Sequence, residues 1–218
     1  MDQSAAPVPP PLPPGSAESP ERQRLSGPAW VRMALLFYGV VLAVAIVWRV
    51  GIEGEPLFYA SAGAAERGVR LGPDLAAGLA AAALVIVLSR ELTRRTASGQ
   101  LLAQTLGRLI GSLTLRECVL LALASGIGEE AFFRGALQPR VGLVAASLLF
   151  GAAHFVPRRG LVAWSAFSVA AGFLLGGLFA WTGNLLAPIA AHVGINAVNL
   201  RLLTLEFGRD EEEASRRL

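Results

Sequence analysis

Long apolar runs are the feature that most limits what this chain can fold into. Several of them reach roughly 15–22 residues, about the length that crosses a 30 Å hydrocarbon core at 1.5 Å per residue. Apolar residues make up 54% of the 218 residues and charged residues only 16%, whereas soluble domains carry about 25% charged residues. A large soluble helical domain would show polar stripes at helical spacing, and the run at 161–183 shows none. The pattern therefore predicts an integral membrane protein.

Proline and glycine breakers divide the apolar runs into separate spans. They predict an all-α, polytopic membrane helical bundle with about six transmembrane helices, at residues 29–50, 71–89, 115–138, 141–156, 161–182 and 185–203. Leucines at helical spacing between 102 and 113 predict a further, amphipathic helix at the membrane interface. Two glycines four residues apart, Gly172 and Gly176, would let a neighbouring helix approach the fifth span closely.

The two ends of the chain differ from its middle. Residues 1–28 hold eight prolines and no apolar core, which is typical of a disordered, Pro-rich tail. The predicted transmembrane domain covers residues 29–205, and its motif-bearing core covers about 115–203. Residues 206–218 form a charged C-terminal tail.

Arginine is the only basic residue type apart from histidine, and its placement predicts the topology. With six spans both tails share one side, and that side takes 14 of the 19 arginines. The positive-inside rule then puts both tails in the cytoplasm and the protein in the cytoplasmic membrane. The net charge is only +3, and the arginines gather in the loops and tails. This pattern indicates a topology signal and predicts no nucleic-acid partner.

Ionisable residues inside membrane spans are costly and mark functional sites. Glu129 and His154 lie about 12 residues on either side of the predicted turn at 139–142, so in an antiparallel hairpin both lie roughly 18 Å from it. His192 and Asn196 lie roughly 13 and 19 Å from the next turn on the same membrane side. The sequence thus predicts one polar level built by three helices, nearer the cytoplasmic face.

Helical spacing also predicts roles for these residues. Glu130 and Arg134 are four residues apart and can pair, while Glu129 points about 100° away and is left free. Glu129 with His154 would then activate a water. His192 and Asn196, on one helix face, would stabilise a tetrahedral oxyanion. The alternative is that each polar residue is an isolated bridge between helices.

Three motifs occur in order along the second half of the chain. Residues 128–135 read GEEAFFRG and match EExxxR, residues 150–154 read FGAAH and match FxxxH, and residues 192–196 read HVGIN and match HxxxN. In these motifs the chain resembles the CAAX prenyl protease and bacteriocin-processing (CPBP, or Abi) family of intramembrane proteases. The ordered trio is much more specific than EExxxR alone.

This resemblance implies an endopeptidase that cuts a membrane-associated or lipidated protein or peptide. It implies that Glu129 is the catalytic glutamate and that His154 is its partner in activating water. The implied catalytic residues are Glu129, His154, His192 and Asn196, with Glu130, Arg134 and Phe150 in support.

The cofactor is left open between no metal and zinc. The family is commonly labelled a metalloprotease, while another interpretation makes it a glutamate-type protease without metal. Glu129, His154 and His192 could bind zinc and leave a position for water, but the sequence has no HExxH or other tight ligand spacing. We favour metal-independent chemistry and keep zinc as the alternative.

Two other functions stay open at this point. A catalytically silent immunity or scaffold protein of the same fold would be favoured by the loss of a site residue, and none is lost. An ion or proton transporter could use the same buried groups, although transporters often show internal repeats and the two halves of this chain show none. The expected partners are a peptide or protein substrate in or at the membrane, and the lipid bilayer.

The predicted topology can be tested by cysteine labelling, because Cys118 is the only native cysteine. In a Cys118→Ser background, a membrane-impermeant thiol reagent added to intact cells should label Gly183→Cys and spare Gly160→Cys. The reverse labelling pattern would turn the protein over in the membrane.

Overall fold

A computed structural model describes residues 27–158 and 161–207. Most of the predicted Pro-rich tail and of the charged C-terminal tail lies outside these residues. The described chain is helical and contains no strand. Its elements are α1 (Gly27–Ile46), η1 (Val47–Ile52), α2 (Ala62–Arg67), α3 (Leu71–Arg95), α4 (Ala97–Ile110), α5 (Leu115–Glu130), η2 (Ala131–Leu137), α6 (Gln138–Ala153), α7 (Val162–Thr182) and α8 (Leu186–Phe207), where η1 and η2 are π-helical.

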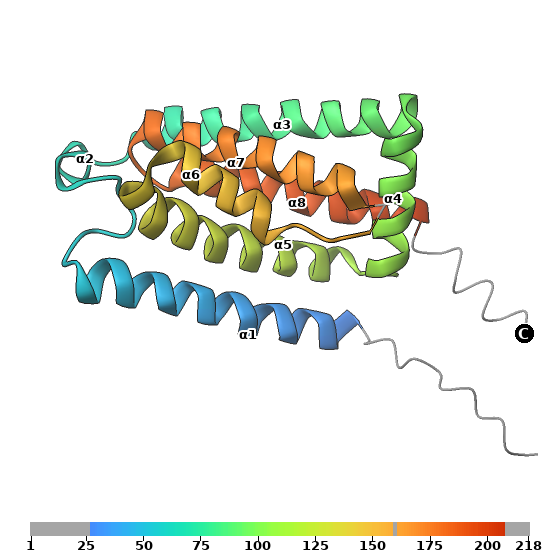
Figure 1. The fold of residues 1–218 in the computed structure, drawn as a ribbon, viewed down its shortest axis with the longest axis horizontal. Helices are drawn as coiled ribbons and strands as arrows, with labels where there is room; N and C mark the ends of the chain where they lie inside the picture. Colours follow the sequence, from blue (N-terminus) through green and yellow to red (C-terminus); the bar gives the residue numbers. More distant parts are fainter. Residues whose placement is uncertain (1–26, 159–160, 208–218) are drawn as a thin grey trace, which may run out of the picture.

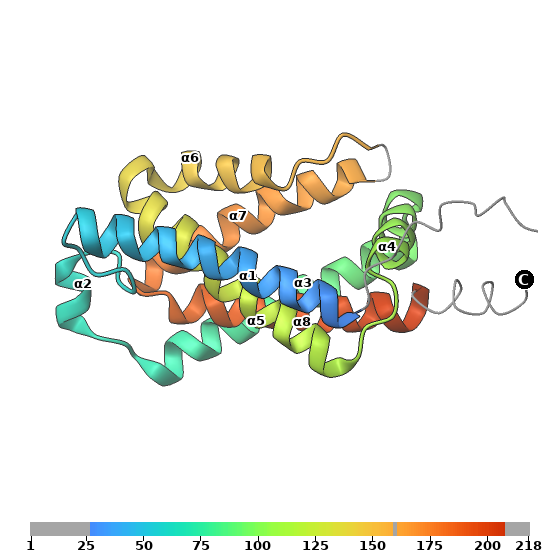
Figure 2. The ribbon, with the colours of Figure 1, turned by 90° about the horizontal axis from the view of Figure 1, so that it is seen from below.

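The six predicted spans lie within five long helical stretches. Five helical stretches of the described chain are long and apolar enough to cross a membrane, and the third of them, Leu115–Ala153, has 39 residues. A straight helix of that length would measure about 58 Å, nearly twice the hydrocarbon thickness. Instead the chain turns at Gly142, where φ is +82°, and α6 folds back alongside α7 (Figure 2).

The third predicted span lies before this turn and the fourth lies after it, so the stretch Leu115–Ala153 contains both. The fourth is shorter than predicted, because helix α6 ends at Ala153 instead of near Val156. The helix beyond Gly142 is therefore too short to cross the membrane alone, and His154 becomes the residue that caps its end. The all-α, polytopic membrane architecture itself is confirmed.

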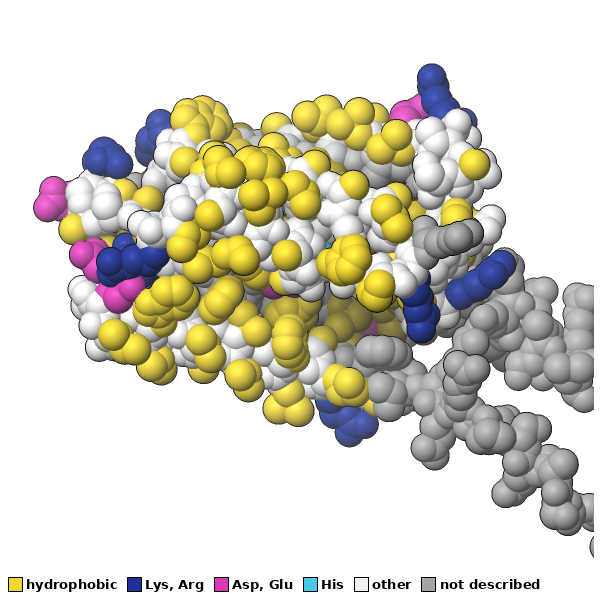
Figure 3. All heavy atoms as spheres, viewed as in Figure 1, with side chains coloured by type: hydrophobic (Ala, Val, Ile, Leu, Met, Phe, Trp, Pro, Cys, Tyr) yellow, Lys and Arg dark blue, Asp and Glu magenta, His cyan; other side chains and the backbone are white. Residues whose placement is uncertain are grey.

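Helix α8 lies at the centre of the bundle, in contact with α3, α4, α5 and α7, and α1 packs on α5 and η2. Apolar side chains cover the face of the molecule that Figure 3 shows, and arginines gather toward its two ends. Helix α1 begins and α8 ends at the same end of the bundle (Figure 1). The described chain thus makes an even number of passages along the bundle.

The predicted amphipathic helix corresponds to α4, which runs across the end of the bundle instead of along it (Figure 1). It ends at Ile110, because Gly111 adopts φ +70°. Leu113, predicted as part of the same repeat, is buried in the linker that follows.

The close approach predicted at Gly172 is present between α6 and α7. A Cβ atom at this position would lie 2.9 Å from the Ser147 carbonyl oxygen. The buried Gly172 carbonyl accepts a hydrogen bond from Arg134 Nη2 at 3.2 Å. The small residue therefore lets the buried arginine reach the backbone of α7.

Candidate functional site

Glu129 and His154 face each other, as their equal distances from the turn predicted. Glu129 lies at the end of α5 and His154 at the end of α6, and the distance from Glu129 Oε2 to His154 Nε2 is 3.5 Å. The other ring nitrogen, Nδ1, lies 2.8 Å from the Phe150 carbonyl oxygen. A carbonyl only accepts hydrogen bonds, so Nδ1 carries a hydrogen. In the neutral ring, Nε2 therefore presents its lone pair to the carboxylate.

Glu130 is the most deeply buried charge of the site, with none of its surface exposed. Its Oε2 lies 3.1 Å from Arg134 Nε, which is the pair that the four-residue spacing predicted. Its Oε1 lies 2.7 Å from His192 Nδ1, a contact that the sequence did not predict. One carboxylate thus joins α5, η2 and α8.

Phe150 fills the space between the two halves of the site. Arg134 lies over its ring, with the guanidinium carbon 4.4 Å from the ring centroid. The ring centroids of His154 and His192 lie 4.5 Å and 6.2 Å from it. The phenylalanine of the FxxxH motif therefore sets the positions of both histidines and of the arginine.

His192 and Asn196 each contact a different polar group on α5, and the sequence did not predict these contacts. His192 Nδ1 contacts Glu130, whereas Asn196 Nδ2 donates to Ser125 Oγ at 3.0 Å. The second N–H of Asn196 and the Nε2 of His192 are not used in these contacts.

A cavity of about 340 Å³ brings the predicted catalytic residues together. Figure 3 shows the hollow above α1, with acidic side-chain atoms visible in its depth. Most of the lining residues are apolar, and the acidic and histidine side chains among them come from α5, α8 and the end of α6. The polar and aromatic lining residues include Glu129, His154, His192, Asn196, Ser125, Tyr38, Trp164 and Phe167.

Three of the lining residues that the sequence did not predict contact the predicted catalytic residues. Ser125 could have been found, because it lies four residues before Glu129 and shares its helix face. Tyr38 of α1, whose hydroxyl lies beside Glu129, carries no sequence signal. Trp164 of α7, whose ring centroid is 5.9 Å from that of His154, carries none either. Both are brought in by helix packing alone.

The donor set for zinc is not assembled in this arrangement. Within residues 27–158 and 161–207, no group of three or more His, Cys, Asp or Glu side chains lies close enough together to hold a metal ion. His192 Nδ1 is held by Glu130, and only its other nitrogen could turn toward Glu129 and His154. The residues as placed do not form a three-ligand site.

The buried Glu130 pair leads to a stability prediction. Glu130→Gln removes the countercharge of Arg134 in a dry environment, so the free energy of unfolding should fall by about 3–5 kcal/mol. Denaturation in detergent micelles measures this change. Glu91→Gln, whose partner Arg95 lies 2.6 Å away at the surface, should cost less than about 1 kcal/mol. Equal losses would show that the buried pair adds no more stability than the surface pair does.

Comparisons with known proteins agree with the three motifs. Residues 111–198 match the family model described as "Type II CAAX prenyl endopeptidase Rce1-like". An uncharacterized protein of Bacillus subtilis (strain 168), YpbD, is 41% identical over 93 residues, which are 42% of this chain and 48% of that protein. The match thus spans about half the length of that relative, and no solved structure matches the chain. Over residues 111–198 the family resemblance is therefore confirmed, and this segment matches the Rce1-like CAAX endopeptidases.

Proposed function

We propose that this protein is an intramembrane endopeptidase that hydrolyses a peptide bond with a water activated by Glu129 and His154. The observation that carries the proposal is the pair of acceptors 3.5 Å apart at the floor of a membrane-embedded cavity. Glu129 Oε2 is buried without a hydrogen-bond partner among the described residues. A water beside the pair can donate one hydrogen to each acceptor and turn its lone pair toward the substrate.

The proposed reaction moves one proton through Glu129. As the water oxygen attacks the scissile carbonyl carbon, Glu129 takes a water proton and the carbonyl oxygen becomes an oxyanion. When the tetrahedral intermediate collapses and the C–N bond breaks, the same carboxyl gives its proton to the leaving amine. His154, fixed by the Phe150 carbonyl, orients the water and holds its second hydrogen.

Residues of α8 stabilise the oxyanion in this proposal. The free N–H of Asn196 is one donor on the cavity wall. His192, whose Nδ1 lies 2.7 Å from the Glu130 carboxylate, adds a second donor at Nε2 when the ring carries both hydrogens. Two preorganised donors in a dry site favour the transition state over the ground-state carbonyl.

The cavity walls and the arginine positions favour a class of substrate and an orientation of the protein in the membrane. The mostly apolar cavity walls favour a membrane-associated or lipidated protein or peptide. The arginine count favours both tails in the cytoplasm of a cytoplasmic membrane. In that orientation the α4 end of the bundle, where α1 begins and α8 ends, faces the cytoplasm. Substrate would then enter from the cytoplasmic leaflet.

Replacing the proposed base tests the activity directly. Glu129→Gln keeps the side-chain shape but removes the base, so the rate of peptide cleavage should fall at least about a hundredfold. The purified protein is incubated with a membrane peptide library and the products are sequenced. Glu66→Gln, an exposed change on α2, should leave the rate unchanged. Cleavage by Glu129→Gln at the wild-type rate would refute Glu129 as the base. No cleavage by the wild-type protein would refute the peptidase assignment and favour a silent scaffold or a transporter.

The metal question has its own test. We expect cleavage to persist in a strong chelator and the purified protein to hold no stoichiometric metal, because the three candidate ligands do not form one cluster. Elemental analysis and cleavage assays before and after chelation measure this. Loss of activity that added zinc restores, with one zinc per chain, would establish the zinc mechanism instead.

A further inference from the structure

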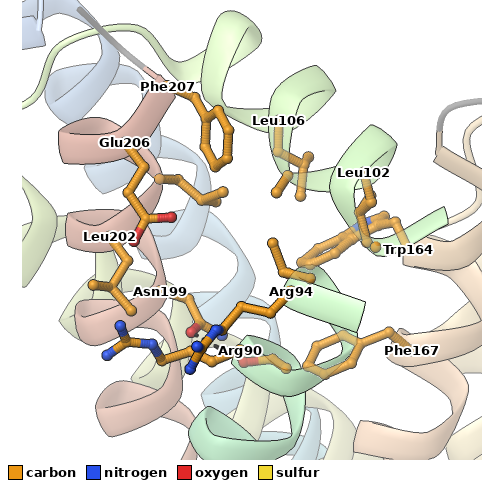
Figure 4. Close-up of a pocket in the computed structure, with 15 residues that line it drawn as sticks. Arg90, Arg94, Leu102, Leu106, Trp164, Phe167, Asn199, Leu202, Glu206 and Phe207 are labelled. Atoms are coloured by element: carbon orange, nitrogen blue, oxygen red, sulfur yellow. Dashed lines mark hydrogen bonds between the residues drawn. The ribbon is translucent and has the colours of Figure 1, made fainter. Parts of the chain in front are cut away.

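A second cavity of about 350 Å³ lies beside the candidate site, where α3, α4, α7 and α8 meet (Figure 4). None of the predicted catalytic residues lines it. It shares one wall with the site cavity, formed by Leu106, Trp164, Phe167, Asn199 and Leu203. A molecule bound in this second cavity would therefore also form part of the boundary of the candidate site.

The rim of this cavity is cationic. Arg90 and Arg94, one turn apart on α3, both line it (Figure 4). Arg94 Nη1 lies 3.7 Å from Glu91 Oε1, whereas Arg90 forms no ion pair within the described part of the chain. Glu206 is the one acidic residue among those that line the cavity. The rim thus carries an excess of positive charge with one guanidinium free.

The interior of the cavity is apolar and aromatic. Figure 4 shows the Leu102 and Leu106 side chains pointing from α4 into the cavity, across from the α8 side chains. Trp164 and Phe167 of α7 stack with their ring centroids 5.8 Å apart. Phe207 closes the α8 side. A ligand that fills this cavity therefore needs an apolar part as well as an anionic group.

The cavity also lies where lipid headgroups are found. Arg90 and Arg94 belong to the last turns of the membrane-spanning stretch Leu71–Arg95, and α4 crosses the bundle at that end. Arginines and tryptophans at the ends of spanning helices sit at the level of the headgroups.

We propose that this cavity binds an anionic phospholipid, with its phosphate at Arg90 and Arg94 and an acyl chain along Leu102 and Phe207. Guanidinium groups match the geometry of phosphate oxygens. The net positive rim selects an anionic headgroup over a zwitterionic one, because a choline group would face the same arginines. This proposal does not depend on the peptidase activity.

Native mass spectrometry of the full-length protein in detergent tests the proposal with two lipids of equal chain length, phosphatidylglycerol and phosphatidylcholine. Phosphatidylglycerol should bind about fivefold more tightly, the usual effect of one arginine near an anionic surface. Arg90→Gln should weaken the binding of phosphatidylglycerol more than that of phosphatidylcholine and so reduce this preference, because it lowers the net positive charge of the rim. The control is Arg95→Gln, because Arg95 pairs with Glu91 at 2.6 Å and does not line the cavity; it should keep the preference.

A second variant tests the apolar part of the cavity. Leu102→Asn should weaken the binding of both lipids by a similar factor. Soluble glycerol phosphate at equal concentration should not displace phosphatidylglycerol. Equal binding of the two lipids by the wild type, or equal losses in Arg90→Gln and Arg95→Gln, would overturn the proposal. Displacement by glycerol phosphate, or by a short peptide with a free carboxylate, would overturn it in favour of a general anion site.

Discussion

The Glu130 carboxylate is the group on which the rest of this structure depends. It is fully buried between Arg134 of η2 and His192 of α8, in a protein whose outer faces are made for lipid. Such a charge is tolerated only where opposite charges and hydrogen-bond donors surround it. Satisfying it fixes the register of α5 against α8. The adjoining Arg134 reaches on to the Gly172 carbonyl of α7, so the same network holds three membrane helices together.

Helix geometry relates the candidate site to the buried Glu130 carboxylate. Glu129 precedes Glu130 and points about 100° away from it, which turns its carboxylate toward the cavity. Helix α6 ends one residue before His154, and the Phe150 carbonyl of the final turn fixes the ring. The π-helical η2 lies between these parts, and π-helical turns are frequent at functional sites. The catalytic proposal therefore rests on side chains whose positions are set by backbone and buried charge.

The sequence predicted those features that depend on distance along a helix. The common depth of Glu129 and His154 and the pairing of Glu130 with Arg134 are both present. Features that depend on how helices rotate and pack were missed, such as the contact of His192 with Glu130 and that of Asn196 with Ser125. The turn predicted from Pro139 and Gly142 is present, because Gly142 adopts a positive φ. The end of the fourth span was predicted too late, near Val156 instead of Ala153, because apolar residues continue past the last helical turn.

The central claim is that Glu129 and His154 act together on one water, and a double-mutant cycle tests it most directly. Two residues that act as a unit show losses that do not add. The rates of cleavage of one peptide are compared for Glu129→Gln, His154→Gln and the variant with both changes. The account predicts that the double variant is within about threefold of the slower single variant, because either change already removes the activated water. Losses that multiply in the double variant would show that the two residues act independently and would contradict the account.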